Sequence, residues 1–156
     1  MLTLLALSAG AIAPVHAQEW PGKPVHLVVP FVPGGATDVL GRLFAERLTT
    51  RLGQPVVIEN RPGAGGNVGA ALVAKSAPDG LTMFIASSPG FTNAEALSKD
   101  AGFSALREFV AVTLLATQSM LLDLHPSVPA NTLQEFVAYV KARPGQLSYG
   151  TPGIGT

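Results

Sequence analysis

The stretch FVPGGATDVLGRLFAERL, residues 31–48, decides the fold of this chain. It follows the short β-branched run VHLVVPF, residues 25–31, which suits a buried strand. Two glycines then lead into a pattern that places apolar residues along one helical face, and we expect a helix over 38–52. The stretch therefore predicts a strand, a glycine turn and a helix, in that order.

The turn itself predicts a binding site for a small anionic solute. Gly34 and Gly35 let the backbone approach a ligand without Cβ atoms in the way. Thr37 is the expected N-cap of the helix, and Asp38 favours its first turn through the helix dipole. No lysine or arginine stands directly beside these four residues, so we expect backbone N–H groups to hold the anion. Taken alone, the motif is equally compatible with a well-built turn and cap.

Outward from this stretch, strands and helices alternate. A second strand is expected over 55–59, a helix over 68–76 with Asn67 as its cap, and a third strand over 81–86. The loops after the strands are rich in glycine or serine, so several of them could surround one ligand. The βαβαβ order predicts the α/β class, with a parallel sheet and helices on both faces.

The second half of the chain is less regular. After an irregular patch over 91–107, apolar runs over 109–116 and 120–124 predict either one long crossing strand or two strands, and a further strand is expected over 147–150. Between the last two, Thr132 and Glu135 form a capping box for a helix. The last expected strand, over 147–150, is followed by a glycine-rich turn over 151–156, but not by the helix that would normally come next. We therefore expect a first lobe over 18–122 and the truncated start of a second lobe over 123–156.

Composition excludes several classes of protein. The 156 residues are 47% hydrophobic, enough for a core, and the 10 Lys and Arg balance the 10 Asp and Glu. Without a net basic charge, a nucleic-acid partner is not expected. Cysteine is absent, which excludes disulfides, thiolate zinc sites and cysteine nucleophiles.

The first 17 residues resemble a secretory signal peptide. An apolar run over 2–12 is followed by Pro14 and by Val15-His16-Ala17, whose small residues resemble a cleavage site. The run is shorter than the roughly 20 residues that span a bilayer, so a permanent membrane anchor is not expected. No positive charge precedes the run, which leaves open a start further upstream or a buried N-terminal helix.

Motifs for catalysis, metal or cofactor binding are absent from the sequence. His26 and His125 lack the spaced partners of a zinc site or a triad, and no G-x-S-x-G elbow occurs. The glycine loop over 63–69 misses the dinucleotide fingerprint and has no P-loop lysine. We expect its glycines to allow close packing, with Asn60 and Arg61 shaping the turn. A binder without catalytic residues, metal or cofactor is therefore favoured.

Two segments carry a family resemblance: PFVPGGATD at 30–38 and NRPGAGGN at 60–67. In this order they resemble the Bug or TctC family of periplasmic solute receptors for tripartite tricarboxylate transporters. The resemblance implies a type II periplasmic-binding-protein fold, whose two lobes close on a small carboxylate solute. It also implies a periplasmic location, membrane permease subunits as partners, and a family chain about twice this length.

The resemblance further implies three ligand loops. In the first loop, backbone N–H groups or the Thr37 hydroxyl would face the solute carboxylate, directly or through water. Without an arginine that binds the carboxylate, the affinity would stay moderate, and the solute could be released to the membrane partner. Asp38 would accept a hydrogen bond from the solute or act only as a cap. The loop over 88–93 departs from the commoner family pattern, which leaves the solute open. The implied ligand-binding residues are Phe31, Gly34, Gly35, Ala36, Thr37, Asp38, Ser87, Ser88, Thr151, Gly153, Gly155 and Thr156.

Two alternatives remain open at this point. The same loops would serve an α/β enzyme that holds a phosphate or acyl substrate, for which Asp38 is the only general base near Gly34. Alternatively, the chain is a truncated product that folds partly, exposes apolar surface and binds nothing.

Overall fold

The chain forms a three-stranded parallel sheet flanked by helices. A computed structural model describes residues 19–97, 101–119 and 121–150. The strands are β1 (Val25–Val29), β2 (Val56–Asn60) and β3 (Thr82–Phe84), in the spatial order β2-β1-β3. Val25 pairs with Val56 in the β1–β2 ladder, and His26 pairs with Thr82 in the β1–β3 ladder. The β-branched run of β1 is almost wholly buried, as a central parallel strand requires.

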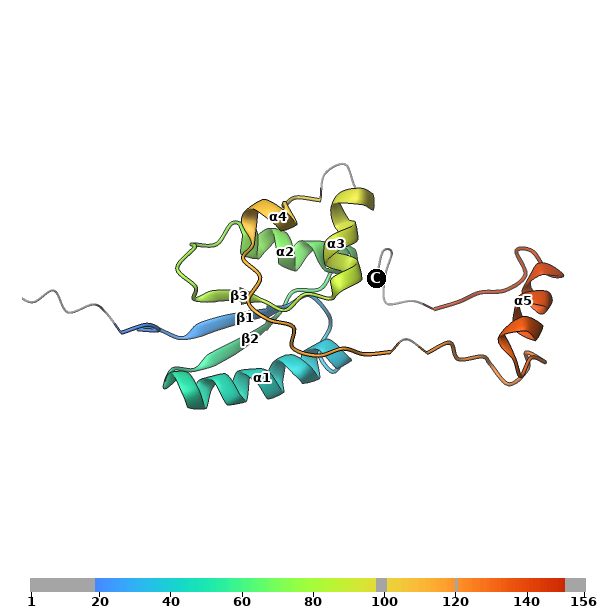
Figure 1. Cartoon of the computed structure of the whole chain (residues 1–156), viewed down its shortest axis with the longest axis horizontal. Helices are drawn as coiled ribbons and strands as arrows, with labels where there is room; N and C mark the ends of the chain where they lie inside the picture. Colours follow the sequence, from blue (N-terminus) through green and yellow to red (C-terminus); the bar gives the residue numbers. More distant parts are fainter. Residues whose placement is uncertain (1–18, 98–100, 120, 151–156) are drawn as a thin grey trace, which may run out of the picture.

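Helices cover both faces of the sheet (Figure 1). On one face, α1 (Ala36–Leu52) packs on β1 and β2. On the other, the short 3₁₀ turn η1 (Ala64–Gly66) leads into α2 (Asn67–Ala74), which packs on β3 and β1. Helices α3 (Ser88–Leu97) and α4 (Ala105–Glu108) lie on the same side as α2. The predicted βαβαβ order and two-sided covering are confirmed.

Each face has its own core. Beneath α1, the buried residues Leu27, Val29 and Ile85 pack with Leu40 and Phe44. Beneath α2 and α3, the core is made of Ala70, Ala94 and Phe103 with a group of partly buried phenylalanines. Strand β1 supplies Leu27 and Val29 to the core beneath α1, whereas Phe84 of β3 packs against the core beneath α2 and α3.

Two glycines set how closely the helices approach the sheet. A Cβ at Gly41 in α1 would lie 3.2 Å from Cγ2 of Val29. A Cβ at Gly69 in α2 would lie 3.2 Å from the Arg61 carbonyl oxygen and 3.3 Å from Cβ of Pro30. The interpretation of the 63–69 glycine loop as a packing device is thus supported at Gly69.

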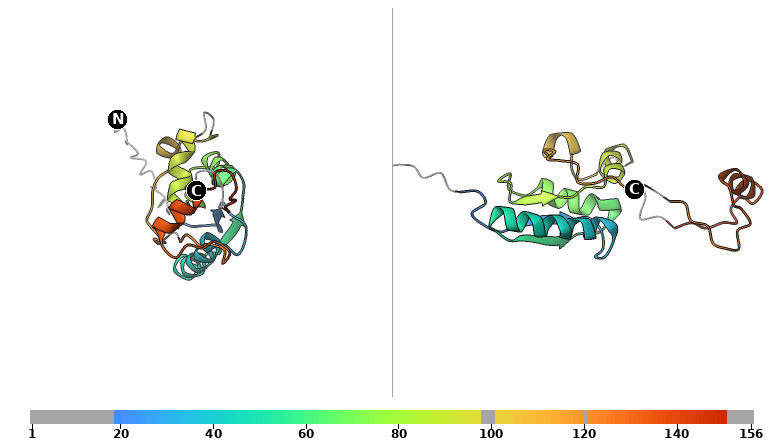
Figure 2. Two further views of the ribbon diagram at one scale, coloured as in Figure 1. Left: turned by 90° about the vertical axis from the view of Figure 1, so that its right-hand side faces the viewer. Right: turned by 60° about the horizontal axis from the view of Figure 1, so that its bottom comes forward.

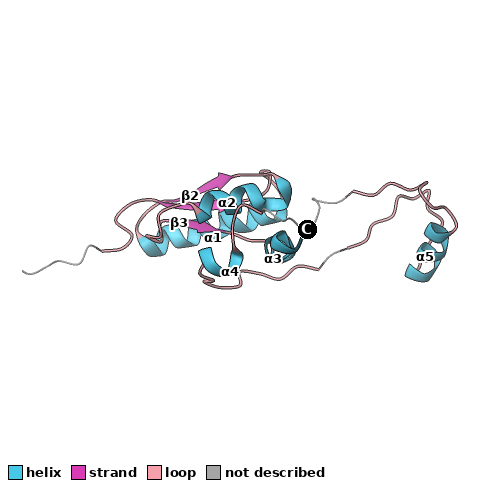
Figure 3. Cartoon of the chain, turned by 90° about the horizontal axis from the view of Figure 1, so that it is seen from above, coloured by secondary structure: helices cyan, strands magenta, loops and turns pink. Residues whose placement is uncertain are grey.

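The last helix lies beyond the carboxyl end of the sheet (Figure 1). Residues 109–119 and 121–132 contain no helix or strand, and they lead to α5 (Leu133–Lys141). Figures 2 and 3 show α5 set apart from the sheet and its helices. The predicted capping box is confirmed: the Glu135 N–H donates to Oγ1 of Thr132, and the Glu135 carboxylate accepts from the Thr132 N–H. Within the described ranges, no helix is long and apolar enough to cross a membrane.

Both predicted N-caps next to the glycine loops are wrong. Helix α1 begins at Ala36 and is capped by Gly35, so Thr37 lies inside its first turn. Helix α2 begins at Asn67 and is capped by Gly66. Neither cap uses a side chain, because both capping residues are glycines; Gly66 has a positive φ of 106°, which glycine adopts without strain.

The irregular patch predicted after β3 is wrong as well, because α3 begins at Ser88 and α4 follows. Pro89 and Gly90 are typical helix breakers, but both lie in the first turn of α3. The Phe91 N–H donates to the Ser87 carbonyl over 3.0 Å, which is the bond expected of a first helical turn. Proline lacks a backbone N–H, and in the first turn an N–H would have no helical acceptor, so Pro89 removes no helical hydrogen bond there.

Of the strands predicted over 109–116, 120–124 and 147–150, none is present in the described residues, which leave out Met120. Strand backbone must bond to a neighbouring strand, and none of these segments pairs with the sheet, whose order is β2-β1-β3. Leu115 nevertheless packs against the core beneath α1. The predicted leader over 1–17 lies outside the described residues.

Candidate solute-binding site

The site is defined by the topology of the sheet. The chain leaves β1 towards β2 on one side and then returns past β1 to β3 on the other. In open α/β sheets, ligands bind outside the carboxyl ends of the strands at such a reversal. The loop after β1 and the loop after β3 both end there, at the right-hand end of the sheet in Figure 1.

Asp38 is the one buried charged residue in the described part of the chain, with 2% of its surface exposed. Its carboxylate accepts hydrogen bonds from the Gly34 N–H (2.9 Å), from Nε and Nη2 of Arg42 (2.9 and 3.1 Å), and from Nδ2 of Asn60 (2.8 Å). The Arg42 guanidinium, followed by the Gly34 and Asn60 donors, holds the pKa of Asp38 far below its usual range. The carboxylate is therefore ionised at neutral pH. We call Asp38, Arg42 and Asn60 the Asp38 network.

The Asp38 network ties the predicted first ligand loop, residues 31–38, to β2. Nδ2 of Asn60 donates to the Phe31 carbonyl (3.1 Å) as well as to Asp38, and Nη2 of Arg42 donates to Oδ1 of Asn60 (3.3 Å). The Gly34 end and the Phe31 end of the loop are thus both fixed. This arrangement reduces the freedom that the loop would lose on binding a ligand.

The expectation that no arginine acts beside the glycine turn is wrong. Arg42, one helical turn after Asp38, reaches back to its carboxylate, and its charge is thereby paired. The signal is present in the sequence as an Asp and an Arg four residues apart on a helix. The bond from Asn60, 22 residues further along than Asp38, has no such local signal.

The start of α1 presents free backbone donors. The Val39 N–H makes the first intrahelical bond, to the Gly35 carbonyl (3.0 Å), so the N–H groups of residues 36–38 have no helical acceptor. Gly34, Gly35 and Ala36 are exposed. Free N–H groups at the positive end of a helix dipole suit an anion.

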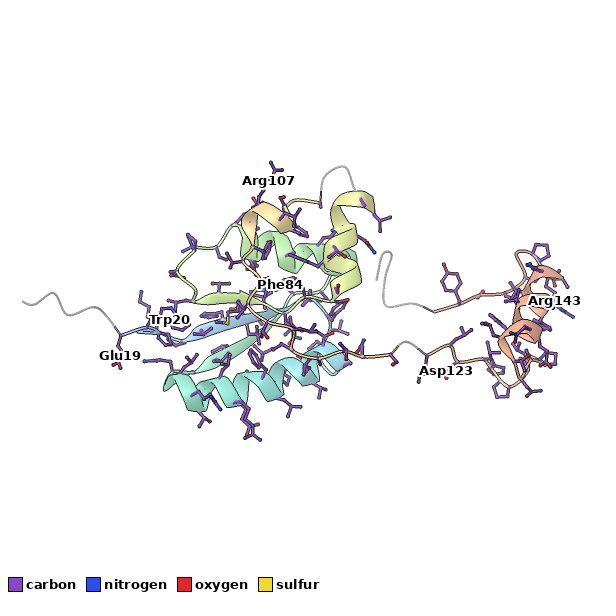
Figure 4. The ribbon with its side chains drawn as sticks, in the orientation of Figure 1. Glu19, Trp20, Phe84, Arg107, Asp123 and Arg143 are labelled. Atoms are coloured by element: carbon purple, nitrogen blue, oxygen red, sulfur yellow. The ribbon has the colours of Figure 1, made fainter. Side chains whose placement is uncertain are left out.

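A small depression opens between the two strand ends and the helices above them. Four of its lining residues are phenylalanines; Phe84, on β3, is labelled in Figure 4. Phe91 stacks on Phe103 with ring centroids 5.4 Å apart and contacts Phe84 at 5.7 Å. We call it the aromatic depression; it is lined by Pro30, Phe31, Gly65, Gly66, Asn67, Ala70, Phe84, Ser87, Gly90, Phe91 and Phe103.

The structure places the predicted site residues in two neighbouring groups. Phe31 and Ser87, from different strand ends, line the aromatic depression together. Residues 34–38 form the start of α1 and are linked to Phe31 through Asn60. Ser88 begins α3, and its carbonyl accepts from Oγ1 of Thr92. Thr151, Gly153, Gly155 and Thr156 lie outside the described residues.

The described histidines make local contacts. Nδ1 of His26 lies 2.6 Å from Oε1 of Glu59, whose pKa is lowered by Arg61 first and by His26 second. This group is partly exposed on the sheet. Nδ1 of His125 lies 2.8 Å from Oγ of Ser127, two residues further along, in an exposed turn. The contact of His26 with Glu59 is a pairing at the protein surface, and that of His125 with Ser127 belongs to a turn.

A parallel sheet covered by helices on both faces, whose strand order reverses beside the start of α1, is the arrangement of an α/β ligand-binding domain. Residues 40–156 match the model of the tripartite tricarboxylate transporter family receptor. This chain therefore belongs to that receptor family.

Individual proteins agree with this assignment. A UPF0065 protein of Bordetella pertussis is 41% identical over 154 residues, which is 99% of this chain and 47% of that protein. The solved structure of Rhodopseudomonas palustris Rpa4515 with adipate has a TM-score of 0.81 at 38% identity, and covers 88% of this chain and 46% of that one. The solved structure of MatC from Rhodopseudomonas palustris with bound malate has a TM-score of 0.67 at 32% identity. The match covers 79% of this chain and 42% of that one. The chain spans about half the length of the curated relatives that it matches.

Proposed function

We propose that this chain forms the first lobe of a periplasmic receptor that captures a small carboxylate for a tripartite tricarboxylate transporter. The observation that carries the proposal is the start of α1, where free N–H groups follow a loop fixed by the Asp38 network. The names of two similar structures give adipate and malate, both carboxylates, as what those proteins bind.

In this proposal the solute carboxylate lies against the first turn of α1. The N–H groups of Gly35, Ala36 and Thr37 and the Thr37 hydroxyl would bind it, directly or through water. Ser87 and Ser88 would contact the solute from the end of β3. Thr151, Gly153, Gly155 and Thr156 would close on it from the second lobe, by a hinge motion of the kind that such receptors undergo.

Asp38 has a different part in the proposal. Because its carboxylate already accepts four hydrogen bonds, it holds the Gly34 N–H and the Asn60 side chain in place. It acts as a positioning residue whose own charge is offset by Arg42. The solute charge is then balanced by backbone dipoles, which permits release to the permease subunits of the transporter.

The test uses the two-lobed receptor, meaning a chain that continues this sequence to the length of its relatives. Its thermal unfolding is followed with dicarboxylates, tricarboxylates and aromatic acids, with sugars and nucleotides as controls. A ligand at 100 times its Kd stabilises the native state by about 2.7 kcal/mol, a readily measured shift in Tm. A shift with acids alone supports the proposal. Shifts with nucleotides alone, or turnover of an ester, would instead support an α/β enzyme.

A further inference from the structure

The side chain of Asn60, the last residue of β2, bonds to both ends of the first ligand loop. We infer that Asn60 is a positioning residue that sets how tightly the site binds every acid, although it does not contact the solute. The inference rests on the proposed function, since it concerns the same site. It follows from the bonds of this side chain, from its fixed place in the sheet and from the exposure of the loop.

The Asn60 amide is directed at the first ligand loop. Its Nδ2 donates to the Phe31 carbonyl over 3.1 Å, where the loop begins, and to Oδ1 of Asp38 over 2.8 Å, where the loop ends. An amide nitrogen carries two hydrogens, so both are engaged. The amide oxygen accepts from Nη2 of Arg42 over 3.3 Å. The side chain therefore has no donor left for a carboxylate solute.

The sheet fixes the position of Asn60 itself. Asn60 pairs with Val29 in the β1–β2 ladder, and the N–H of the next residue, Arg61, donates to the Val29 carbonyl over 2.8 Å. A side chain on a paired strand is held more precisely than one on a loop. The two bonds from Asn60 therefore attach the loop to the rigid part of the domain.

The loop between these two bonds lies on the surface. Residues 32–36 are exposed, and Gly34 and Gly35 give the backbone more freedom than other residues would. Without the Asn60 amide, the loop would also adopt conformations in which its N–H groups do not converge on one carboxylate. A ligand that binds one conformation loses affinity in proportion to the population of that conformation. Because this population belongs to the free receptor, every acid should lose affinity by the same factor.

The test measures the Kd values of adipate, succinate, malate and citrate by calorimetric titration of the two-lobed receptor. In Asn60→Ala, the Kd of each acid that binds should rise by about tenfold, and the order of the acids should stay the same. An unchanged Kd in the folded variant, or a changed order of acids, would overturn the inference and leave the proposed function intact. Absence of binding by every acid to the unmodified receptor would reject the proposed function itself.

The control is Gln54→Ala, which removes an amide at the other end of the same strand. Gln54 is partly buried, as Asn60 is, but it lies before β2 begins, at the end of the strand away from the first ligand loop. The Kd values should therefore stay unchanged in this variant. A rise equal to that in Asn60→Ala would show a general effect of disturbing β2 and would overturn the inference.

Asn60→Asp separates hydrogen bonding from packing. Aspartate has nearly the size of asparagine, but it places an acceptor where Asn60 donates, 2.8 Å from Oδ1 of Asp38. Two carboxylates in contact repel each other, so at neutral pH the Kd should rise further than in Asn60→Ala. A rise no larger than that in Asn60→Ala would show that the volume of the side chain matters and not its donors, which would overturn the inference.

If neither Asn60 variant folds, hydrogen exchange of the unmodified receptor decides. The Gly34 N–H, which donates to Asp38 over 2.9 Å, reports whether the loop is already held in place without solute. Slow exchange of this amide in the solute-free receptor supports the inference. Exchange that becomes slow only when an acid is bound would overturn it, because the loop would then be ordered by the solute and not by Asn60.

Discussion

Asp38, in the first turn of α1, bonds to the turn at Gly34, to Arg42 four residues further along the helix, and to Asn60 at the end of β2, which is distant in sequence. A buried carboxylate is costly unless its oxygens are bonded, and here each oxygen has two donors. The carboxylate thereby fixes the loop whose N–H groups the proposed function uses. Its removal should affect both folding stability and solute affinity.

Asp38→Asn is expected to lower the Tm of the two-lobed receptor by several degrees at pH 7, because Arg42 loses its partner. The pKa of Asp38 is lowered in the folded state, so its stabilising contribution is present above its unfolded pKa of about 4. That contribution is lost as the pH falls towards the folded pKa. The Tm difference between the two proteins should therefore narrow below about pH 4, as measured by scanning calorimetry.

Asp123→Asn is the matched control, because Asp123 is exposed in the extended segment that leads to α5 (Figure 4). It removes the same charge and should leave the Tm unchanged at both neutral and acidic pH. A Tm difference for Asp38→Asn that stays constant down to about pH 2 would contradict the role assigned to the carboxylate.

At the same scale, the sequence predicts only part of the site. The glycines, the hydroxyl and the carboxylate of the first loop can be singled out from their position after a strand. The pairing of Asp38 with Arg42 is also within reach, since the residues lie four apart on a helix. The hydrogen bond from Asn60 to Asp38 cannot be predicted from the sequence pattern. It depends on the parallel pairing of β1 with β2, which brings Asn60 opposite Val29.

Among the elements, α2 depends on close contact with the loop beneath it. Gly69→Val is expected to destabilise the two-lobed receptor by about 1–3 kcal/mol, because the new side chain would meet the Arg61 carbonyl and Pro30. Leu72→Val, on the exposed side of the same helix, is the control and should cost less than about 1 kcal/mol. Both values are obtained from chemical denaturation. Similar values for the two variants would show that α2 does not need a close approach at Gly69.

The capping box of α5 makes a separate prediction. Thr132→Ala removes the acceptor for the Glu135 N–H, which lies 3.2 Å away, and should cost about 1 kcal/mol of helix stability. Hydrogen exchange should then be roughly fivefold faster at the first amides of α5, including the Phe136 N–H that bonds to the Thr132 carbonyl. Gln134→Ala, at an exposed position of the same turn, is the control. Because alanine favours the helix slightly more than glutamine does, the exchange rates should stay the same or decrease. Equal exchange in both variants would argue against the cap.

The elements show where sequence patterns succeed and fail. The three strands of the sheet and the helices after the first two are predictable, because each contains several apolar residues and is bounded by glycine or proline. Helix α3 escapes prediction because Pro89 and Gly90 look like breakers, although a first helical turn tolerates both. The pattern over 109–116 suits a strand, but a strand also requires a partner, which a local pattern does not reveal.

For the molecule as a whole, the extended segment after α4 leaves large apolar side chains in contact with solvent. Val110 is 91% exposed, Val112 is 84% exposed and Leu114 is 76% exposed. Their alternate spacing suits one face of a strand, and their exposure matches the apolar surface predicted from the sequence. In the two-lobed receptor we expect this face to be covered.

The 156-residue chain should therefore bind a hydrophobic dye more strongly than the two-lobed receptor does. Replacing Val112 and Leu114 by lysine in the short chain should lower the dye fluorescence. Val25 and Val28 are fully buried in β1, so this strand should not contribute to the signal. Equal dye binding by the two chains would show that the segment is not covered in the longer one.

The most direct test of the central claim, that the turn at Gly34 binds the solute, is the acid affinity of two glycine variants. Gly34 and Gly53 both have positive φ, 88° and 66°, and an added Cβ would meet no atom within 4 Å at either position. Alanine at each should destabilise the two-lobed receptor by about 1–2 kcal/mol. Gly34→Ala should raise the Kd of the best-binding acid by about tenfold or more, which corresponds to a loss of about 1.4 kcal/mol or more of binding free energy. Gly53→Ala should leave this Kd unchanged. Equal affinity of the two variants would contradict the account, since Gly53 ends α1 far from its N-terminal turn.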